Sequence, residues 1–415
     1  MQAPTSTRVL SIDVLRGLTI AFMILVNDPG DWAHVYPQLD HAPWNGFTAT
    51  DLVFPNFLFL IGVSIILSLH SRIARGQSRR TLALHILRRA AALFAIKLFL
   101  SAFPHFHLAH LRLYGVLTRI ALCYLAAGLL CLAVWNAPRR ARTLLAIAVV
   151  LLLGYWGLMR FVPVLGFGVP THAMPLLDPD RNLAAWLDRA VNALTQRFLH
   201  TGSLYNHTRD PEGLLSTLPA IATTLLGSLT GLCLIAENLS PAAKLRLFAR
   251  YGVLLALLGL AWNRTFSINK NLWTSSYVLF AAGLSLLLLA LCYWLIDIRR
   301  LNQTRAGAAL LWPWLVFGSN AIFAYCFSDL VVETLIAIKV PAAALASPAA
   351  LASPAALASP AAPTTPISAW LWLYLHLFAR RHSTELTSLA FALAFTALCF
   401  VPNWLLWRRK IFLKV

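Results

Sequence analysis

Long apolar segments recur along the whole chain and constrain its fold more than any other feature. Each is about 17–27 residues long, enough for a helix to cross the hydrocarbon core of a bilayer. A helix also satisfies its own backbone hydrogen bonds, as lipid requires. The sequence therefore predicts an all-α, polytopic helical membrane protein with about ten transmembrane helices. We expect them near residues 10–26, 51–70, 84–103, 113–134, 143–161, 214–236, 247–262, 272–296, 312–338 and 386–407.

The distribution of basic residues predicts how these helices are oriented. Only 12% of the 415 residues are charged, yet the net charge is +19. If the N-terminus lies inside, the inner connections and the C-terminal tail are rich in arginine and lysine, whereas the short outer loops hold few. This positive-inside asymmetry predicts that both termini are cytoplasmic. Because the basic residues are spread over separate helix ends, the charge does not indicate a nucleic-acid partner.

The longer connections divide the chain into three parts. Residues 1–338 are expected to form the transmembrane bundle, including a long outer segment at 162–213. Residues 339–366 are a low-complexity Ala/Pro loop, and 367–415 hold an interfacial segment and the last transmembrane helix. Apolar residues at helical spacing over 183–198 predict an amphipathic helix, either on the outer membrane surface or as a lid on the bundle.

Polar side chains concentrate in the first outer segment, residues 27–50. Imidazole is the side chain best suited to take and return a proton near neutral pH, which makes His41 a candidate base. Asn27 and Asn45 carry amide donors of the kind that stabilise an oxyanion. A histidine at the outer mouth of a helix is also often an ordinary interfacial residue, and that interpretation of His41 stays open.

Asp51 has two interpretations. It lies three residues after Thr48, as in a capping box, where the helix N-terminus favours a carboxylate. It also lies ten residues after His41, where it is able to orient the imidazole.

Charged residues inside the predicted helices are expensive in lipid and usually face a partner or a pathway. Asp13 and Arg16 lie one turn apart near the inner end of the first helix, as expected for an intrahelical pair. Lys97 is placed so that it can reach the outer surface. Arg119 lies about a third of the way along its helix and is harder to explain structurally, so a bound anion is a reasonable partner.

Two further clusters lie in outer loops. His105, His107 and His110 share a short loop that offers no carboxylate or cysteine, and we predict no metal site there. Asp210-Pro211-Glu212 has the pattern of a helix start, with Asp at the N-cap and Pro at the first helical position. Contact with a cationic acceptor group is the alternative for these two carboxylates.

Several of these motifs together resemble the heparan-α-glucosaminide N-acetyltransferase family and its bacterial relatives. The resemblance covers most of residues 8–296, and its first block is the most specific. It rests on Ser11–Gly17, Asn27, His41, Trp44–Gly46, Asp51–Pro55, Gly115–Arg119, Asp210–Gly213, Leu218–Ala220 and Ile268–Trp273.

The resemblance implies an enzyme that moves acetyl from cytoplasmic acetyl-CoA to the amine of a glucosamine-type sugar on the outer side of the membrane. The family's active histidine matches His41 and its neighbouring asparagine matches Asn27. We add Asp51 as a third catalytic residue, orienting His41. Arg16, Arg119 and Asn45 are expected to contact acetyl-CoA, which acts as a co-substrate, with no cofactor bound permanently.

The same resemblance implies a multi-pass protein of the cell inner (plasma) membrane. The expected partners are acetyl-CoA, an amino-sugar acceptor and the lipid bilayer, and whether the chain is a monomer or a homodimer stays open. Two other functions compete with this one. The first is a transporter of an amino sugar or envelope fragment, and the second is a polysaccharide O-acyltransferase.

Overall fold

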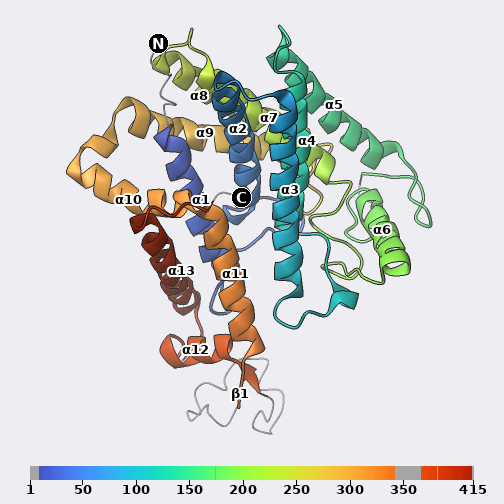
Figure 1. The fold of residues 1–415 in the computed structure, drawn as a ribbon. Coiled ribbons are helices and arrows are strands. Elements are labelled where there is room, and N and C mark those ends of the chain that lie inside the picture. Colours follow the sequence, from blue (N-terminus) through green and yellow to red (C-terminus); the bar gives the residue numbers. More distant parts are fainter. Residues whose placement is uncertain (1–8, 173, 342–365, 381, 414–415) are drawn as a thin grey trace.

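The computed structural model describes residues 9–172, 174–341, 366–380 and 382–413, which form a helical bundle (Figure 1). The helices are α1 (Leu10–Asn27), α2 (Val53–Ala74), α3 (Arg79–Ala102), α4 (Val116–Ala133), α5 (Arg140–Phe161), α6 (Leu183–Leu199), α7 (Thr217–Ile235), α8 (Pro241–Trp262), α9 (Ser275–Cys292), α10 (Arg305–Ser319), α11 (Ala321–Ala337), α12 (Ala369–Leu377) and α13 (Glu385–Arg408). Shorter helical turns are η1 (Thr50–Leu52), η2 (Leu108–His110), η3 (Tyr293–Ile298) and η4 (Leu301–Gln303). Strand β1 (Lys339–Val340) pairs antiparallel with β2 (Ile367–Ser368), on either side of the Ala/Pro loop, most of which lies outside the described residues.

The predicted class of a helical, polytopic membrane protein is confirmed. Among the described helices, eight are long and apolar enough to cross a membrane, or nine if the bent pair α10–α11 forms one span. The predicted span at 84–103 is present as α3, which is 24 residues long. It falls outside that set because it carries several basic residues, namely Arg79, Arg80, Arg88, Arg89 and Lys97.

The predicted single helix at 312–338 is wrong, because the chain breaks within it. Helices α10 and α11 meet at an angle of 76° on either side of Asn320. The Asn320 side chain donates to the carbonyl of Ile411 (3.0 Å) and accepts from the amide of Leu413 (2.8 Å). The break is therefore held by the segment that follows α13, which lies far away in the sequence.

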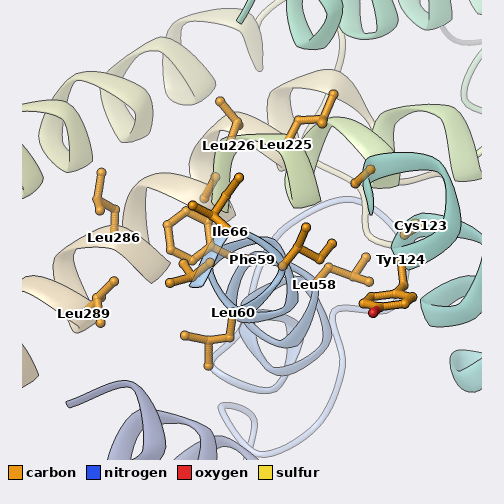
Figure 2. Packing of buried hydrophobic residues seen from close by; sticks show 14 of the residues in the cluster. Leu58, Phe59, Leu60, Ile66, Cys123, Tyr124, Leu225, Leu226, Leu286 and Leu289 are labelled. Atoms are coloured by element: carbon orange, nitrogen blue, oxygen red, sulfur yellow. The ribbon is translucent and has the colours of Figure 1, made fainter. Parts of the chain in front are cut away.

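The buried core is centred on α2. Figure 2 shows its side chains surrounded by those of α4, α7 and α9. The labelled residues are Leu58, Phe59, Leu60 and Ile66 of α2, Cys123 and Tyr124 of α4, Leu225 and Leu226 of α7, and Leu286 and Leu289 of α9. Since α2 begins two residues after Asp51, this packing fixes the position of the α1–α2 loop, which carries the candidate site.

Glycine allows α2 and α7 to approach each other closely. A Cβ atom on Gly227 of α7 would lie 1.9 Å from the carbonyl oxygen of Phe59, and one on Gly62 of α2 would lie 1.9 Å from that of Thr224. Small residues at helix contacts are typical of membrane bundles, where close packing replaces the hydrophobic effect.

Substituting Gly227 with alanine should therefore destabilise the bundle. The added methyl group meets backbone atoms, which cannot move aside as a side chain can, and overpacking of this kind typically costs about 1–3 kcal/mol. A matched control is Gly154→Ala on α5, where nothing lies within 4 Å of the new Cβ. The control should be neutral or stabilising by about 0.5–1 kcal/mol, since alanine favours a helix. Thermal unfolding in nanodiscs compares the two, and equal midpoints would contradict the packing argument.

The segment 162–213, predicted to lie outside, contains the predicted amphipathic helix as α6. Its N-terminal part packs on the protein, with Asp188 buried, whereas Phe198 at the other end is 70% exposed. The segment is also tied to the first outer loop, because the Trp44 indole donates to the carbonyl of Leu177 (2.7 Å). The predicted interfacial segment near 369–379 forms α12, which packs against α11 and, through Trp370 and Tyr374, against Phe391 of α13, and is too short to span.

Candidate active site

His41 and Asp51 form a hydrogen-bonded pair in the loop between α1 and α2. The imidazole Nδ1 lies 2.7 Å from Asp51 Oδ1. The carboxylate is almost fully buried (1% exposed), whereas the His41 side chain is 41% exposed. The pair thus has one end fixed inside the protein and one end facing outward.

Asp51 is held by the start of the helix as well as by His41. Its Oδ2 accepts from the amides of Ala42 (3.1 Å) and Thr48 (3.0 Å) and from the Thr48 hydroxyl (3.2 Å). The hydrogen bond that the Thr48 backbone amide donates to Asp51 is one of the two hydrogen bonds of the predicted capping box. Both interpretations of Asp51 are therefore present at once, with one oxygen fixing the turn and the other contacting His41.

The surroundings of Asp51 assign the tautomer of His41. The Asp51 carboxylate already accepts hydrogen bonds from three donors, and an ionised carboxylate can only accept. We therefore assign the proton of the His41–Asp51 hydrogen bond to Nδ1 of His41. The other ring nitrogen, Nε2, then carries the lone pair. This is the arrangement that a general base or a nucleophilic imidazole needs.

Lys270 completes the cluster, and the sequence did not single it out as a site residue. Its Nζ lies 2.9 Å from His41 Nε2, 3.1 Å from His41 Nδ1 and 3.9 Å from Asp51 Oδ1. Burial lowers the pKa of Lys270 from its usual range, and the nearby carboxylate of Asp51 offsets this only in part. The only signal in the sequence was its place in the motif Ile268–Trp273.

The loop that carries Lys270 is joined to the His41 loop by hydrogen bonds. The Asn269 side chain donates to Asn45 Oδ1 (3.1 Å), and the Gly46 amide donates to the carbonyl of Ile268 (2.9 Å). The Tyr277 hydroxyl donates to the carbonyl of Asp51 (2.7 Å). Asn45, predicted to contact acetyl-CoA, is thus placed where it joins the two loops.

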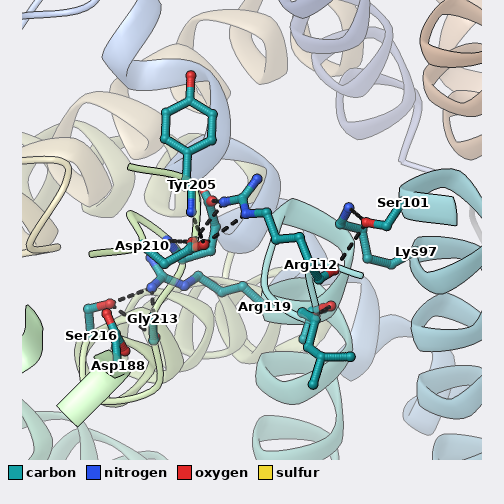
Figure 3. Close-up of polar contacts among 12 residues, drawn as sticks. Lys97, Ser101, Arg112, Arg119, Asp188, Tyr205, Asp210, Gly213 and Ser216 are labelled. Carbon is teal, nitrogen blue, oxygen red and sulfur yellow. Dashed lines mark hydrogen bonds and ion pairs between the residues drawn. The ribbon is translucent and has the colours of Figure 1, made fainter. Parts of the chain in front are cut away.

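Two arginines, Arg112 before α4 and Arg119 in its first turn, contact the segment that precedes α7 (Figure 3). Arg112 binds Asp210 through two bonds of 2.7 Å and Glu212 through one of 2.6 Å. Asp210 is therefore not the N-cap of a helix. That prediction is wrong, because α7 begins only at Thr217 and Asp210 is engaged by a side chain 98 residues away.

Arg119 is fully buried (0% exposed) in the first turn of α4. Its Nη2 donates to the carbonyl of Gly213 (3.0 Å) and to the Ser216 hydroxyl (Figure 3). Its guanidinium lies 5.0 Å from the Trp273 ring centre. Among the described residues, its Nε and Nη1 have no hydrogen-bond partner. The predicted contact of Arg119 with an anion remains a prediction.

Comparison with known proteins identifies the family. The catalytic region described as "Heparan-alpha-glucosaminide N-acetyltransferase, catalytic" matches residues 8–259, more than half of the 415 residues. The chain belongs to this family. The predicted resemblance is thereby confirmed, and the matched region contains His41 and Asp51. Lys270 lies beyond its end, on the loop between α8 and α9, and contacts both residues.

Two similar proteins have the name Heparan-alpha-glucosaminide N-acetyltransferase. The protein named Heparan-alpha-glucosaminide N-acetyltransferase from Mus musculus is 29% identical over 360 residues, which are 77% of this chain and 53% of the mouse protein. The protein of the same name from Homo sapiens is 29% identical over 359 residues, or 77% of this chain and 52% of the human one. The chain therefore spans about half the length of the curated relatives it matches.

Not every site residue predicted for a heparan-α-glucosaminide N-acetyltransferase relative gathers at His41. Asn27 is the last residue of α1 and is exposed, and its side chain makes no hydrogen bond within the described residues. Arg16 binds Asp13 (3.0 Å), as predicted for an intrahelical pair, and also the Ser64 hydroxyl (3.0 Å). In the predicted orientation, Arg16 lies in the inner half of the bundle and Arg119 in the outer half.

The remaining candidates have structural partners. His105 and His107 stack on each other with ring centres 5.9 Å apart, and the described residues contain no group of three or more metal-ligating side chains. A cavity of about 130 Å³ lies between α3, α4, α6 and α7, lined by residues such as Phe94, Tyr114 and Val191. Its lining includes neither His41 nor Lys270, so it is separate from the candidate active site of this acetyltransferase relative.

Proposed function

We propose that this chain is a transmembrane N-acetyltransferase that moves acetyl from cytoplasmic acetyl-CoA to the amine of a glucosamine-type sugar on the outer side of the membrane. Membership of the family and the names of its relatives support the transfer of acetyl to glucosamine. The observation that carries the proposal is the contact of His41 with buried Asp51, which places the lone pair of the imidazole on Nε2.

In the proposed reaction, the neutral amine of the acceptor attacks the carbonyl carbon of the thioester. The C–N bond forms, and the C–S bond then breaks as CoA leaves as a thiolate. Nε2 of His41 takes the proton that the amine loses and returns it to the thiolate or to water. Asp51 holds the imidazole in the required tautomer and stabilises the imidazolium while it exists.

Lys270 would stabilise the negative charge that develops on the carbonyl oxygen. In the structure its ammonium lies against Nε2, so the acceptor displaces it as the amine approaches His41. The flexible four-carbon stem of lysine permits this small movement. We further propose that the exposed amide of Asn27 donates to the acetyl carbonyl, because its side chain is not engaged within the described part of the chain.

The location, the co-substrate and the oligomeric state belong to the same proposal. The multi-pass helices place the protein in a membrane, and we assign it to the inner (plasma) membrane. Acetyl-CoA is a co-substrate, no cofactor is held permanently, and the functional unit is a monomer or a homodimer.

Acetyl transfer by the purified chain tests the proposal. Protein in nanodiscs is mixed with acetyl-CoA labelled in the acetyl group and with glucosamine, and the product is identified by mass spectrometry. We expect labelled N-acetylglucosamine that is stable to hydroxylamine. A hydroxylamine-sensitive product would indicate an O-acyltransferase instead. Uptake of unmodified amino sugar into proteoliposomes, without acetylation, would favour the transporter.

A further inference from the structure

The cavity between α3, α4, α6 and α7, which lies apart from His41, has an apolar end and a polar end. Phe94 of α3 and Leu122 of α4 line the apolar end, and each is 38% exposed. In the predicted orientation, Leu122 lies roughly 9 Å deeper than the first residue of α4, at 1.5 Å per residue. Exposed apolar side chains at this depth on a helix that can span the membrane face hydrocarbon. The apolar end of the cavity therefore meets the lipid.

The polar end of the cavity is built by loops at the outer ends of these helices. Tyr114 comes from the loop that leads into α4, and Ser203 and Glu212 come from the segment between α6 and α7. The Ser203 hydroxyl donates to the carbonyl of His110 (2.9 Å), which joins the two loops. The cavity thus changes from polar to apolar in the same direction as a bilayer does, from its surface to its interior.

Apolar side chains are also exposed around the polar end. Phe106 and Leu108 of the α3–α4 loop, and Leu194 and Phe198 of α6, are all more than half exposed. Exposed apolar patches of this kind mark contact with a membrane or a partner, and α6 has the amphipathic pattern of a helix in the bilayer surface. This apolar surface adjoins the lipid-facing side of α4, so the membrane supplies the occupant of the cavity.

The Tyr114 hydroxyl gives the cavity one hydrogen-bonding group that the protein leaves unused. Its Oη atom is buried and has no partner among the described residues. A buried polar group without a partner is costly, and a phenol hydroxyl can donate to an oxygen atom of a bound molecule. A ligand with a carbonyl oxygen at the end of a hydrocarbon chain would match both ends of the cavity. The acyl ester of a glycerolipid has this chemistry.

The size and charge of the cavity restrict the lipid further. Its volume is about 130 Å³. Because an apolar cavity of about 150 Å³ holds one benzene molecule, this cavity takes part of one chain and not a whole lipid. Glu212 lines the cavity, whereas no Lys, Arg or His does so within the described part of the chain. Since a carboxylate repels an anionic head group, a zwitterionic lipid fits better.

We propose that this cavity binds a zwitterionic glycerolipid of the outer leaflet. One acyl chain lies against Phe94 and Leu122, and its ester carbonyl accepts a hydrogen bond from the Tyr114 hydroxyl. The head group lies in the bilayer surface beside Glu212. A chain in this position contacts α3, α4 and α6 at once and so joins the outer segment to the transmembrane helices. The site is independent of acetyl transfer, because its residues have no part in the proposed reaction.

Photo-cross-linking in detergent solution tests the site. Purified protein is titrated with phosphatidylcholine that carries a diazirine in one acyl chain, and cross-linked peptides are identified by mass spectrometry. We expect saturable cross-links to α3, α4 and α6, with Phe94, Leu122 and Val191 among the modified residues. The matched dialkyl ether lipid lacks the ester carbonyl. It should therefore half-saturate at a concentration about 2- to 10-fold higher, the loss expected for one neutral hydrogen bond.

Tyr114→Phe removes only the hydroxyl, so it should weaken binding of the ester lipid by the same factor and abolish the difference between ester and ether lipids. Tyr251→Phe is the matched control, because Tyr251 lies on α8, is 49% exposed and does not line the cavity. Val191→Phe fills the cavity and should reduce cross-linking by both lipids, whereas Val150→Phe on the exposed face of α5 should not. Thermal midpoints show whether each variant folds.

Three results would overturn the proposal. The first is equal half-saturation by ester and ether lipids in the wild-type protein, or a difference between them that persists in Tyr114→Phe. The second is cross-linking spread evenly over the exposed faces of α5 and α8, which would show ordinary solvation by lipid and no site. The third is tighter binding of phosphatidylglycerol with the same chains, which would exclude the preference for a zwitterionic head group.

Discussion

Substituting His41 with alanine is expected to lower the rate of acetyl transfer by about 10²–10⁴-fold, the usual contribution of a positioned general base. The loss should appear in kcat measured with labelled acetyl-CoA and glucosamine. The His41 side chain is 41% exposed and sits at the mouth of the site, so its removal should leave folding and donor binding nearly intact. Intact-mass analysis after mixing wild-type protein with acetyl-CoA alone distinguishes an acetyl-histidine intermediate from direct transfer.

His34 provides a matched control within the same loop. Its Nδ1 lies 2.8 Å from Asp31 Oδ2, which reproduces the contact of His41 with Asp51. Asp31, however, is bound by the Ser383 hydroxyl (2.6 Å), which ties this second pair to the C-terminal part of the chain. His34→Ala should therefore keep wild-type turnover. Equal losses in the two variants would show that the loop, and not the base at His41, is what transfer requires.

The helical membrane fold could be predicted because the length of an apolar segment is enough to indicate a transmembrane helix. The break at Asn320 could not, because apolar residues continue on both sides and the groups that hold the break come from Ile411 and Leu413. Asp210 was misjudged for a related reason. Its local pattern is that of a helix start, but its carboxylate binds Arg112. A pattern of neighbouring residues cannot predict a partner that is 98 residues away in the sequence.

The candidate site was predictable where its contacts are local. His41 and Asp51 are ten residues apart, and the turn that caps α2 brings them together. Lys270 is 229 residues from His41, and a single lysine in an outer loop resembles any solvated cation. Arg119 was recognisable as unusual because a charge inside an apolar helix requires a partner. Its partners include the Gly213 carbonyl, which carries no sequence signal.

Substituting Lys270 with methionine should lower kcat by about 10²–10³-fold, the loss typical of removing one donor to a developing oxyanion. Methionine fills a similar volume without charge, and the His41–Asp51 contact does not depend on the ammonium. KM for acetyl-CoA should change little, because the interaction strengthens only as charge develops in the transition state. Lys244→Met is the control, since Lys244, in the first turn of α8, binds the Leu234 carbonyl of α7 (2.6 Å) and lies outside the cluster.

The pH dependence separates this role from a structural one. Burial lowers the pKa of Lys270, so the ammonium is lost as pH rises through a value below the ordinary lysine value of about 10.4. Wild-type kcat should therefore fall on the basic side below that value. Lys270→Arg, which stays charged, should retain part of the rate and lose this basic limb. A Lys270→Met protein with wild-type kcat, or an unchanged basic limb in Lys270→Arg, would exclude the ammonium from the reaction and leave His41 and Asp51 to act without it.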